Sequence, residues 1–112
     1  MTRGGETFPL DDDREITGIN SPRDRVGGPY VVVFKNVEDR WAIVAMDWEG
    51  EPRLGIRWFW EKNGHPSVRG YPTWLVIPPE LNKSILFGLP LAHKFSDRLE
   101  EYLTGKISGE AL

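Results

Sequence analysis

Few residues of this chain have the type and spacing that chemistry requires. The 112 residues include no cysteine and two histidines, His65 and His93. Without cysteine there is no thiolate zinc site, no disulfide and no thiol nucleophile. The two histidines fall in different expected elements, and neither has a partner at metal-ligand spacing. The carboxylates of residues 11–13 could hold a hard cation, but such a run is usually hydrated. We therefore expect no metal site and no cofactor.

Motifs for phosphate binding and for hydrolysis are also missing from the sequence. No glycine-rich phosphate loop is present, and Gly27-Gly28 precedes an expected strand, whereas a phosphate loop opens a helix. No serine lies in a Gly-x-Ser-x-Gly turn. Asp47 and Glu49 lie near an expected hairpin tip, where exposed carboxylates are not tuned for acid–base catalysis. We therefore expect a protein that is not an enzyme.

Aromatic and basic side chains gather in the middle of the chain. Five tryptophans occur between Trp41 and Trp74. Such rings most often fill a sheet core, but they can also form the apolar walls of a ligand pocket. A carboxylate facing a pair of indoles would suit a cation. The candidate ligand-binding residues are Asp47, Arg57, Trp58, Trp60, Tyr71 and Trp74.

Two other functions fit the same residues. Bases could stack on the rings of a nucleic-acid surface, or Trp, Tyr and Arg could anchor a protein interface. Nucleic acid is the less favoured partner because 14 basic and 17 acidic residues give a net charge of −3. Apolar stretches such as 42–46 are far shorter than a membrane span. With no secretory signal visible and no cysteine, we expect a cytoplasmic protein without membrane contact.

An antiparallel sheet is expected to carry these residues. Residues 1–28 have no sustained hydrophobic period and are predicted to form an arm, partly disordered or laid on the surface. A single domain is expected over 29–105, with strands at 30–34, 41–48, 54–60 and about 73–77. A turn at Glu49-Gly50 would place Trp41 opposite Trp58, whereas a three-residue turn would place Met46 opposite Leu54.

The hydrophobic period changes to that of helices after Pro78. Leu81, Ile85 and Leu89 are four apart, and Gly88 could end this helix in a left-handed conformation. A second helix is expected over 91–104, ended by Gly105, followed by a loose tail at 106–112. The prediction is an α+β fold, namely an antiparallel meander of about four strands followed by two helices packed on the sheet.

Three segments carry a resemblance to a group of known proteins. They are Leu54 to Phe59, Arg69 to Trp74 and Ile77 to Leu81. Together they resemble small uncharacterised bacterial proteins of the kind carried on integron mobile gene cassettes. The resemblance covers about half of the chain. It implies a stand-alone bacterial domain and transfers no functional residue.

The second face of the sheet is apolar in either register, so something must cover it: the arm, a helix or a second copy of the chain. We expect a protein-interaction domain that forms a homodimer through this face or through an exposed edge strand. In the first register, Val44 and Met46 would lie on the dimerising face. The alternative is a small-molecule binding protein with a pocket lined by Trp58, Trp60 and Trp74.

Overall fold

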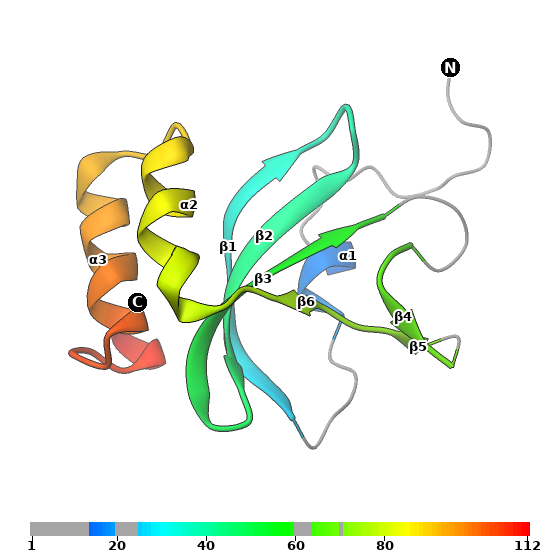
Figure 1. The fold of residues 1–112 in the computed structure, drawn as a ribbon, viewed down its shortest axis with the longest axis horizontal. Coiled ribbons are helices and arrows are strands. Elements are labelled where there is room, and N and C mark those ends of the chain that lie inside the picture. Colours follow the sequence, from blue (N-terminus) through cyan, green and yellow to red (C-terminus); the bar gives the residue numbers. More distant parts are fainter. Residues whose placement is uncertain (1–13, 20–24, 60–63, 70) are drawn as a thin grey trace.

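The protein is an α+β domain in which a four-stranded antiparallel sheet is followed by C-terminal helices, as predicted (Figure 1). The computed structural model describes residues 14–19, 25–59, 64–69 and 71–112. Neighbouring strands follow the order β1-β2-β3-β6, and a separate two-stranded hairpin is formed by β4 and β5. The strands are β1 (Val26–Asn36), β2 (Trp41–Trp48), β3 (Glu51–Trp58), β4 (Ser67–Val68), β5 (Tyr71–Pro72) and β6 (Leu75–Val76).

Helices lie at both ends of the described chain. A short helix precedes the sheet, and two longer helices follow it. The helical segments are α1 (Arg14–Thr17), the 3-10 turn η1 (Pro79–Leu81), α2 (Asn82–Gly88), α3 (His93–Leu103) and the 3-10 turn η2 (Gly109–Ala111). In Figure 1, α2 and α3 lie together on one side of the sheet, whereas the β4–β5 hairpin extends from the other.

The register of the central hairpin is the first of the two predicted. Trp41 lies opposite Trp58, and Ile43 lies opposite Ile56. The connecting turn has two residues, Glu49 and Gly50, with φ of 54° and 84°. Positive φ at both central positions gives a turn whose twist matches that of the flanking strands. This turn therefore sets which side chains share a face.

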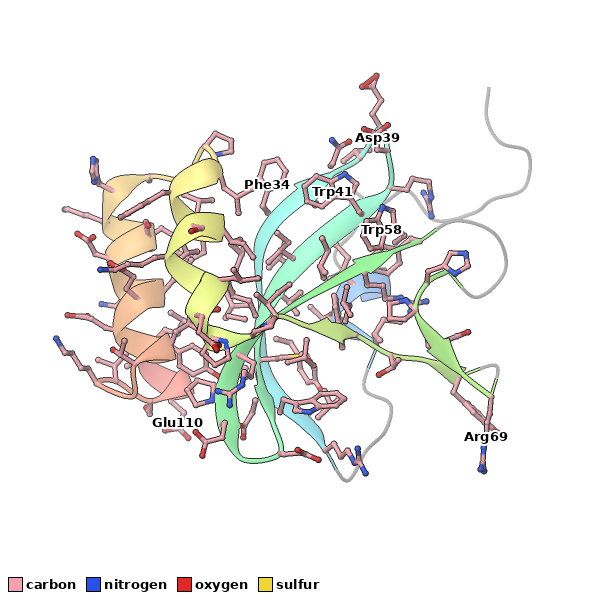
Figure 2. The ribbon with its side chains drawn as sticks, viewed as in Figure 1. Phe34, Asp39, Trp41, Trp58, Arg69 and Glu110 are labelled. Atoms are coloured by element: carbon pink, nitrogen blue, oxygen red, sulfur yellow. The ribbon has the colours of Figure 1, made fainter. Side chains whose placement is uncertain are left out.

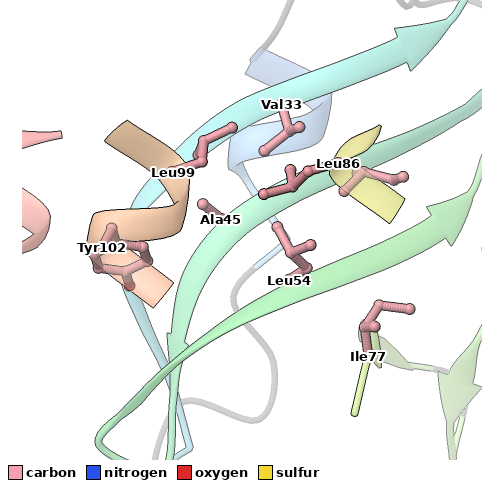
Figure 3. Packing of buried hydrophobic residues seen from close by; sticks show 8 residues of the cluster. Val33, Ala45, Leu54, Ile77, Leu86, Leu99 and Tyr102 are labelled. Atoms are coloured by element: carbon pink, nitrogen blue, oxygen red, sulfur yellow. The ribbon is translucent and has the colours of Figure 1, made fainter. Parts of the chain in front are cut away.

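The helix-side face of the sheet holds one of two apolar clusters (Figure 3). Alternate residues of the strands, including Ile43, Ala45 and Leu54, meet Leu86 of α2 and Leu99 of α3 there. In α3, Phe95, Leu99 and Tyr102 recur at spacings of three and four, so this helix turns one side to the sheet. In α2 the buried residue is Leu86, and Ile85 and Leu89 pack beside it.

The second face of the sheet is covered by the chain itself. Val44 and Met46 are fully buried there against Ile16 of α1 and against Phe59 and Trp74. The indole Nε1 of Trp74 donates a hydrogen bond to the carbonyl oxygen of Ile19, 3.0 Å away. Of the three covers considered from sequence, the N-terminal segment is therefore the one found.

Several predicted boundaries need correction. The sheet begins at Val26, three residues before the predicted domain start. The third strand ends at Trp58, and the last strand is only two residues long. The β4–β5 hairpin was not predicted, because Pro66 and Pro72 weaken a strand pattern in sequence. The dipeptide Asn63-Gly64 also predicts a hairpin turn after the third strand, but Asn63 lies outside the described residues.

The C-terminal segment differs from the loose tail that was predicted. Ile107 and Leu112 pack against the helix-side cluster, and an added Cβ at Gly109 would lie 3.0 Å from Pro29 Cδ. Gly105 has φ of 84° and ends α3 as expected, whereas Gly88 lies outside the positive-φ region and ends α2 without a left-handed residue. The left-handed turn at Gly105 sends the chain back toward β1.

Candidate functional site

One candidate surface is a group of partly exposed apolar side chains on the helix-side face of the sheet. We call the group Phe34, Trp41, Ile56, Trp58 and Leu75 the aromatic face. Phe34 and Trp41 have ring centroids 5.5 Å apart. Figure 2 shows Phe34, Trp41 and Trp58 following one another at the end of the sheet near Asp39.

Strand pairing explains why these five side chains are neighbours. Trp41 lies opposite Trp58 on adjacent strands, and Ile56 lies opposite Leu75. Residues directly opposite in an antiparallel pair have side chains on the same face and in contact range. Leu75 is 51% exposed, and the other four are intermediate in burial. The result is an apolar surface that reaches from β1 to β6.

Arg57 lies on the opposite face of the sheet and is 2% exposed. Its Nη1 donates hydrogen bonds to the carbonyl oxygens of Pro66 and Thr73. Its guanidinium carbon lies 5.3 Å from the ring centroid of Phe59, which in turn meets Trp74 edge-on at 6.5 Å. These hydrogen bonds connect the ends of the β4–β5 hairpin to the sheet. Because Arg57 is buried, a ligand in solution cannot reach its guanidinium group.

The predicted pocket residues are not brought together. Trp58 and Trp74 lie on opposite faces of the sheet and so cannot line one pocket. Tyr71 lies on β5 and is 66% exposed. Trp60 lies outside the described residues. Asp47 is six positions along β2 from Trp41, which is about 20 Å at the rise of a strand.

A cleft is present beside Asp47, at the end of the sheet far from Trp58. Its volume is about 220 Å³. It lies between the sheet, the end of α3 and the segment that follows α3. The lining residues are Gly28, Pro29, Asp47, Pro52, Tyr102, Gly105, Ile107, Ser108 and Gly109.

Tyr102 forms part of the cleft wall and is tied to the sheet. Its hydroxyl donates a hydrogen bond to the carbonyl oxygen of Met46, 2.8 Å away. Burial, and secondarily the negative charge of Asp47, raise the pKa of Tyr102 to about 12. The phenol is thus neutral at ordinary pH and acts as a hydrogen-bond donor beside a carboxylate.

Sequence reasoning named Asp47 but missed the rest of this cleft. Tyr102 and Ser108 are more than 50 positions from Asp47, and no local pattern links residues so far apart. The one sequence feature that pointed to this part of the cleft was Gly105, because a glycine after a stripe of helical spacing predicts a left-handed turn. That turn brings Ile107 to Gly109 against the sheet.

The described residues contain no group of three or more His, Asp or Glu side chains arranged to hold a metal ion. Over the same part of the chain, no helix has both the length and the apolar character needed to cross a bilayer. Comparison with known proteins gave no match to a family model, to a curated protein or to a solved structure. The resemblance to integron-cassette proteins therefore stays a prediction.

Proposed function

We propose that the protein is a non-enzymatic interaction domain that associates with a second copy of itself through the aromatic face. The observation that carries this proposal is the continuity of five apolar side chains over four adjacent strands, with Leu75 half exposed. Aromatic side chains are enriched in the cores of protein interfaces because they bury much area at little entropic cost.

A second copy is the favoured partner because one apolar surface can meet its own copy about a two-fold axis. Two-fold dimers use the same patch on both subunits and are the commonest form of soluble oligomer. Trp41 and Trp58 would stack against the partner's rings, and Leu75 would fill the space beside them. The charged turn residues Glu38 and Asp39 are exposed at the end of this surface, as in the polar rim of an interface.

The other surfaces considered for self-association are less suitable. Val44 and Met46 are fully buried within the chain, so the second sheet face is closed to a partner. The sheet edges are also poor pairing surfaces. β6 has two residues, and Pro78 and Pro79 come one residue after its end; the pairing of β1 shifts register twice. Short, irregular and proline-flanked edges resist pairing with another strand.

The test is the mass of the protein in solution as its concentration is varied. The chain has a mass of 12.8 kDa. We expect sedimentation equilibrium to show a monomer–dimer equilibrium for the wild type. Leu75→Glu should weaken the dimer at least about tenfold, because a charge would be buried without a partner.

Phe87→Glu is the matched control. Phe87 is also apolar and is 73% exposed, but it lies on α2, outside the aromatic face. This variant should dimerise as the wild type does. A wild type that stays monomeric at every concentration, or a Leu75→Glu protein that dimerises unchanged, would refute the proposal.

A further inference from the structure

We propose that the cleft beside Asp47 binds a small primary alkylammonium ion. The cleft is open to solvent and has one acidic side chain among its lining residues, which are otherwise uncharged. A volume of about 220 Å³ corresponds to roughly seven water molecules at about 30 Å³ each. It therefore suits a ligand with few non-hydrogen atoms.

The charge of Asp47 is not neutralised by the residues around it. Asp47 is half-buried, and among the described residues no ion pair joins it to a lysine, arginine or histidine. Its register neighbours are Gly27 on β1 and Pro52 on β3, which have no cationic group. A partly desolvated carboxylate attracts a cation more strongly than one in open water, because the local dielectric is lower.

The end of α3 adds to the preference for a positive charge. The helix spans 11 residues from His93 to Leu103, and Tyr102 and Gly105 at its C-terminal end line the cleft. The C-terminal end of a helix has a partial negative charge. Asp47 and the helix end thus act on a bound ion with the same sign.

The remaining walls indicate an alkylammonium ion in preference to a metal ion. Pro29, Pro52 and Ile107 offer apolar surface to a short carbon chain. An ammonium group has three N–H donors, and the Asp47 carboxylate and the Ser108 hydroxyl can accept hydrogen bonds from them. Hard metal ions such as Ca²⁺ need six or more oxygen ligands, and this cleft has a single carboxylate.

This site is independent of the proposed dimer. Asp47 and the aromatic face lie at opposite ends of β2, so a ligand in the cleft would not compete with a second copy at Trp41. Failure of one proposal therefore leaves the other in place.

The experiment is a titration of the full chain, labelled with ¹⁵N, with propylammonium chloride, followed by amide NMR shifts. We expect saturable shifts centred on Gly28, Gly105 and Gly109. Propanol, which has the same length and no charge, should cause no saturable shift. Tetramethylammonium has the charge but no N–H donor, and it should bind at least about tenfold more weakly.

Asp47→Asn keeps the size of the side chain and removes its charge. It should weaken propylammonium binding at least about tenfold, whereas Asp97→Asn on the exposed side of α3 should not. Equal affinity in wild type and Asp47→Asn, or wild-type shifts centred away from the cleft, would overturn the proposal. If Asp47→Asn does not fold, the wild-type shift map and the propanol comparison decide the question alone.

Discussion

Arg57 holds Pro66 and Thr73 against the sheet, and it does so while almost fully buried. Buried polar groups are stable only when they are hydrogen-bonded, and two backbone carbonyls accept from this guanidinium. Its contact with the Phe59 ring adds a further favourable interaction. Arg57 is thus a charged side chain whose hydrogen bonds stabilise the packing of the β4–β5 hairpin on the sheet.

Arg57→Met should lower the free energy of unfolding by about 3 kcal/mol, because the buried Thr73 carbonyl would lose the Arg57 donor and the Pro66 carbonyl would keep only the backbone N–H of Thr73. Urea unfolding measures this difference. Arg53→Met is the control, since the Arg53 hydrogen bond goes to its own neighbour Pro52 and the residue is partly exposed. Equal losses in the two variants would contradict the role assigned to Arg57.

Among the elements, the turns show how backbone conformation decides the effect of a side chain. Gly50 in the β2–β3 turn has φ of 84°, whereas Gly88 at the end of α2 is not in the positive-φ region. An added Cβ would meet nothing within 4 Å at either position. Any difference between alanine substitutions at these sites therefore reports conformation and not packing.

Gly50→Ala should lower the free energy of unfolding by roughly 1 kcal/mol, because a residue with a Cβ is strained at positive φ. Gly88→Ala should leave it unchanged or raise it by up to about 1 kcal/mol, since alanine favours a helix. Thermal unfolding of both variants gives the sign of each effect. A loss of stability at Gly88 as large as that at Gly50 would be inconsistent with the turn described.

In the molecule as a whole, the sheet lies between two unequal covers. Helices α2 and α3 cover one face apart from the partly exposed aromatic face, and the other is closed by α1 together with Phe59 and Trp74. Ile16 is fully buried, although it lies in a segment of weak hydrophobic pattern. The N-terminal segment is thus part of the folded domain at this point.

Ile16→Ala should lower the free energy of unfolding by about 2–4 kcal/mol, as expected when a buried side chain is truncated and leaves a cavity. Phe87→Ala, at a site 73% exposed, should change it by less than about 0.5 kcal/mol. Chemical denaturation of the two variants makes the comparison. An unchanged Ile16→Ala protein would show that α1 does not close the second face in solution.

The sequence alone determined the local order of this fold. Alternating apolar residues and the turn residues near Glu49-Gly50 predicted a hairpin in one of two registers, and the structure has the register that pairs Trp41 with Trp58. The change to helical spacing after Pro78 predicted α2 and α3. These features depend on residues close together in the chain, and periodicity reports such local geometry directly.

Tertiary structure decided what covers each face and which candidate residues meet. In the sequence, Trp58 and Trp74 were both candidates for the same pocket, but in the structure they lie on opposite faces of the sheet. Helix α1, which helps to cover the second face, comes from a segment with no clear hydrophobic period. Tyr102 reaches the carbonyl of Met46, 56 positions away, and so completes the wall of the Asp47 cleft. Alternation fixes the face on which a side chain lies, but contacts between distant segments depend on the packing of the whole chain.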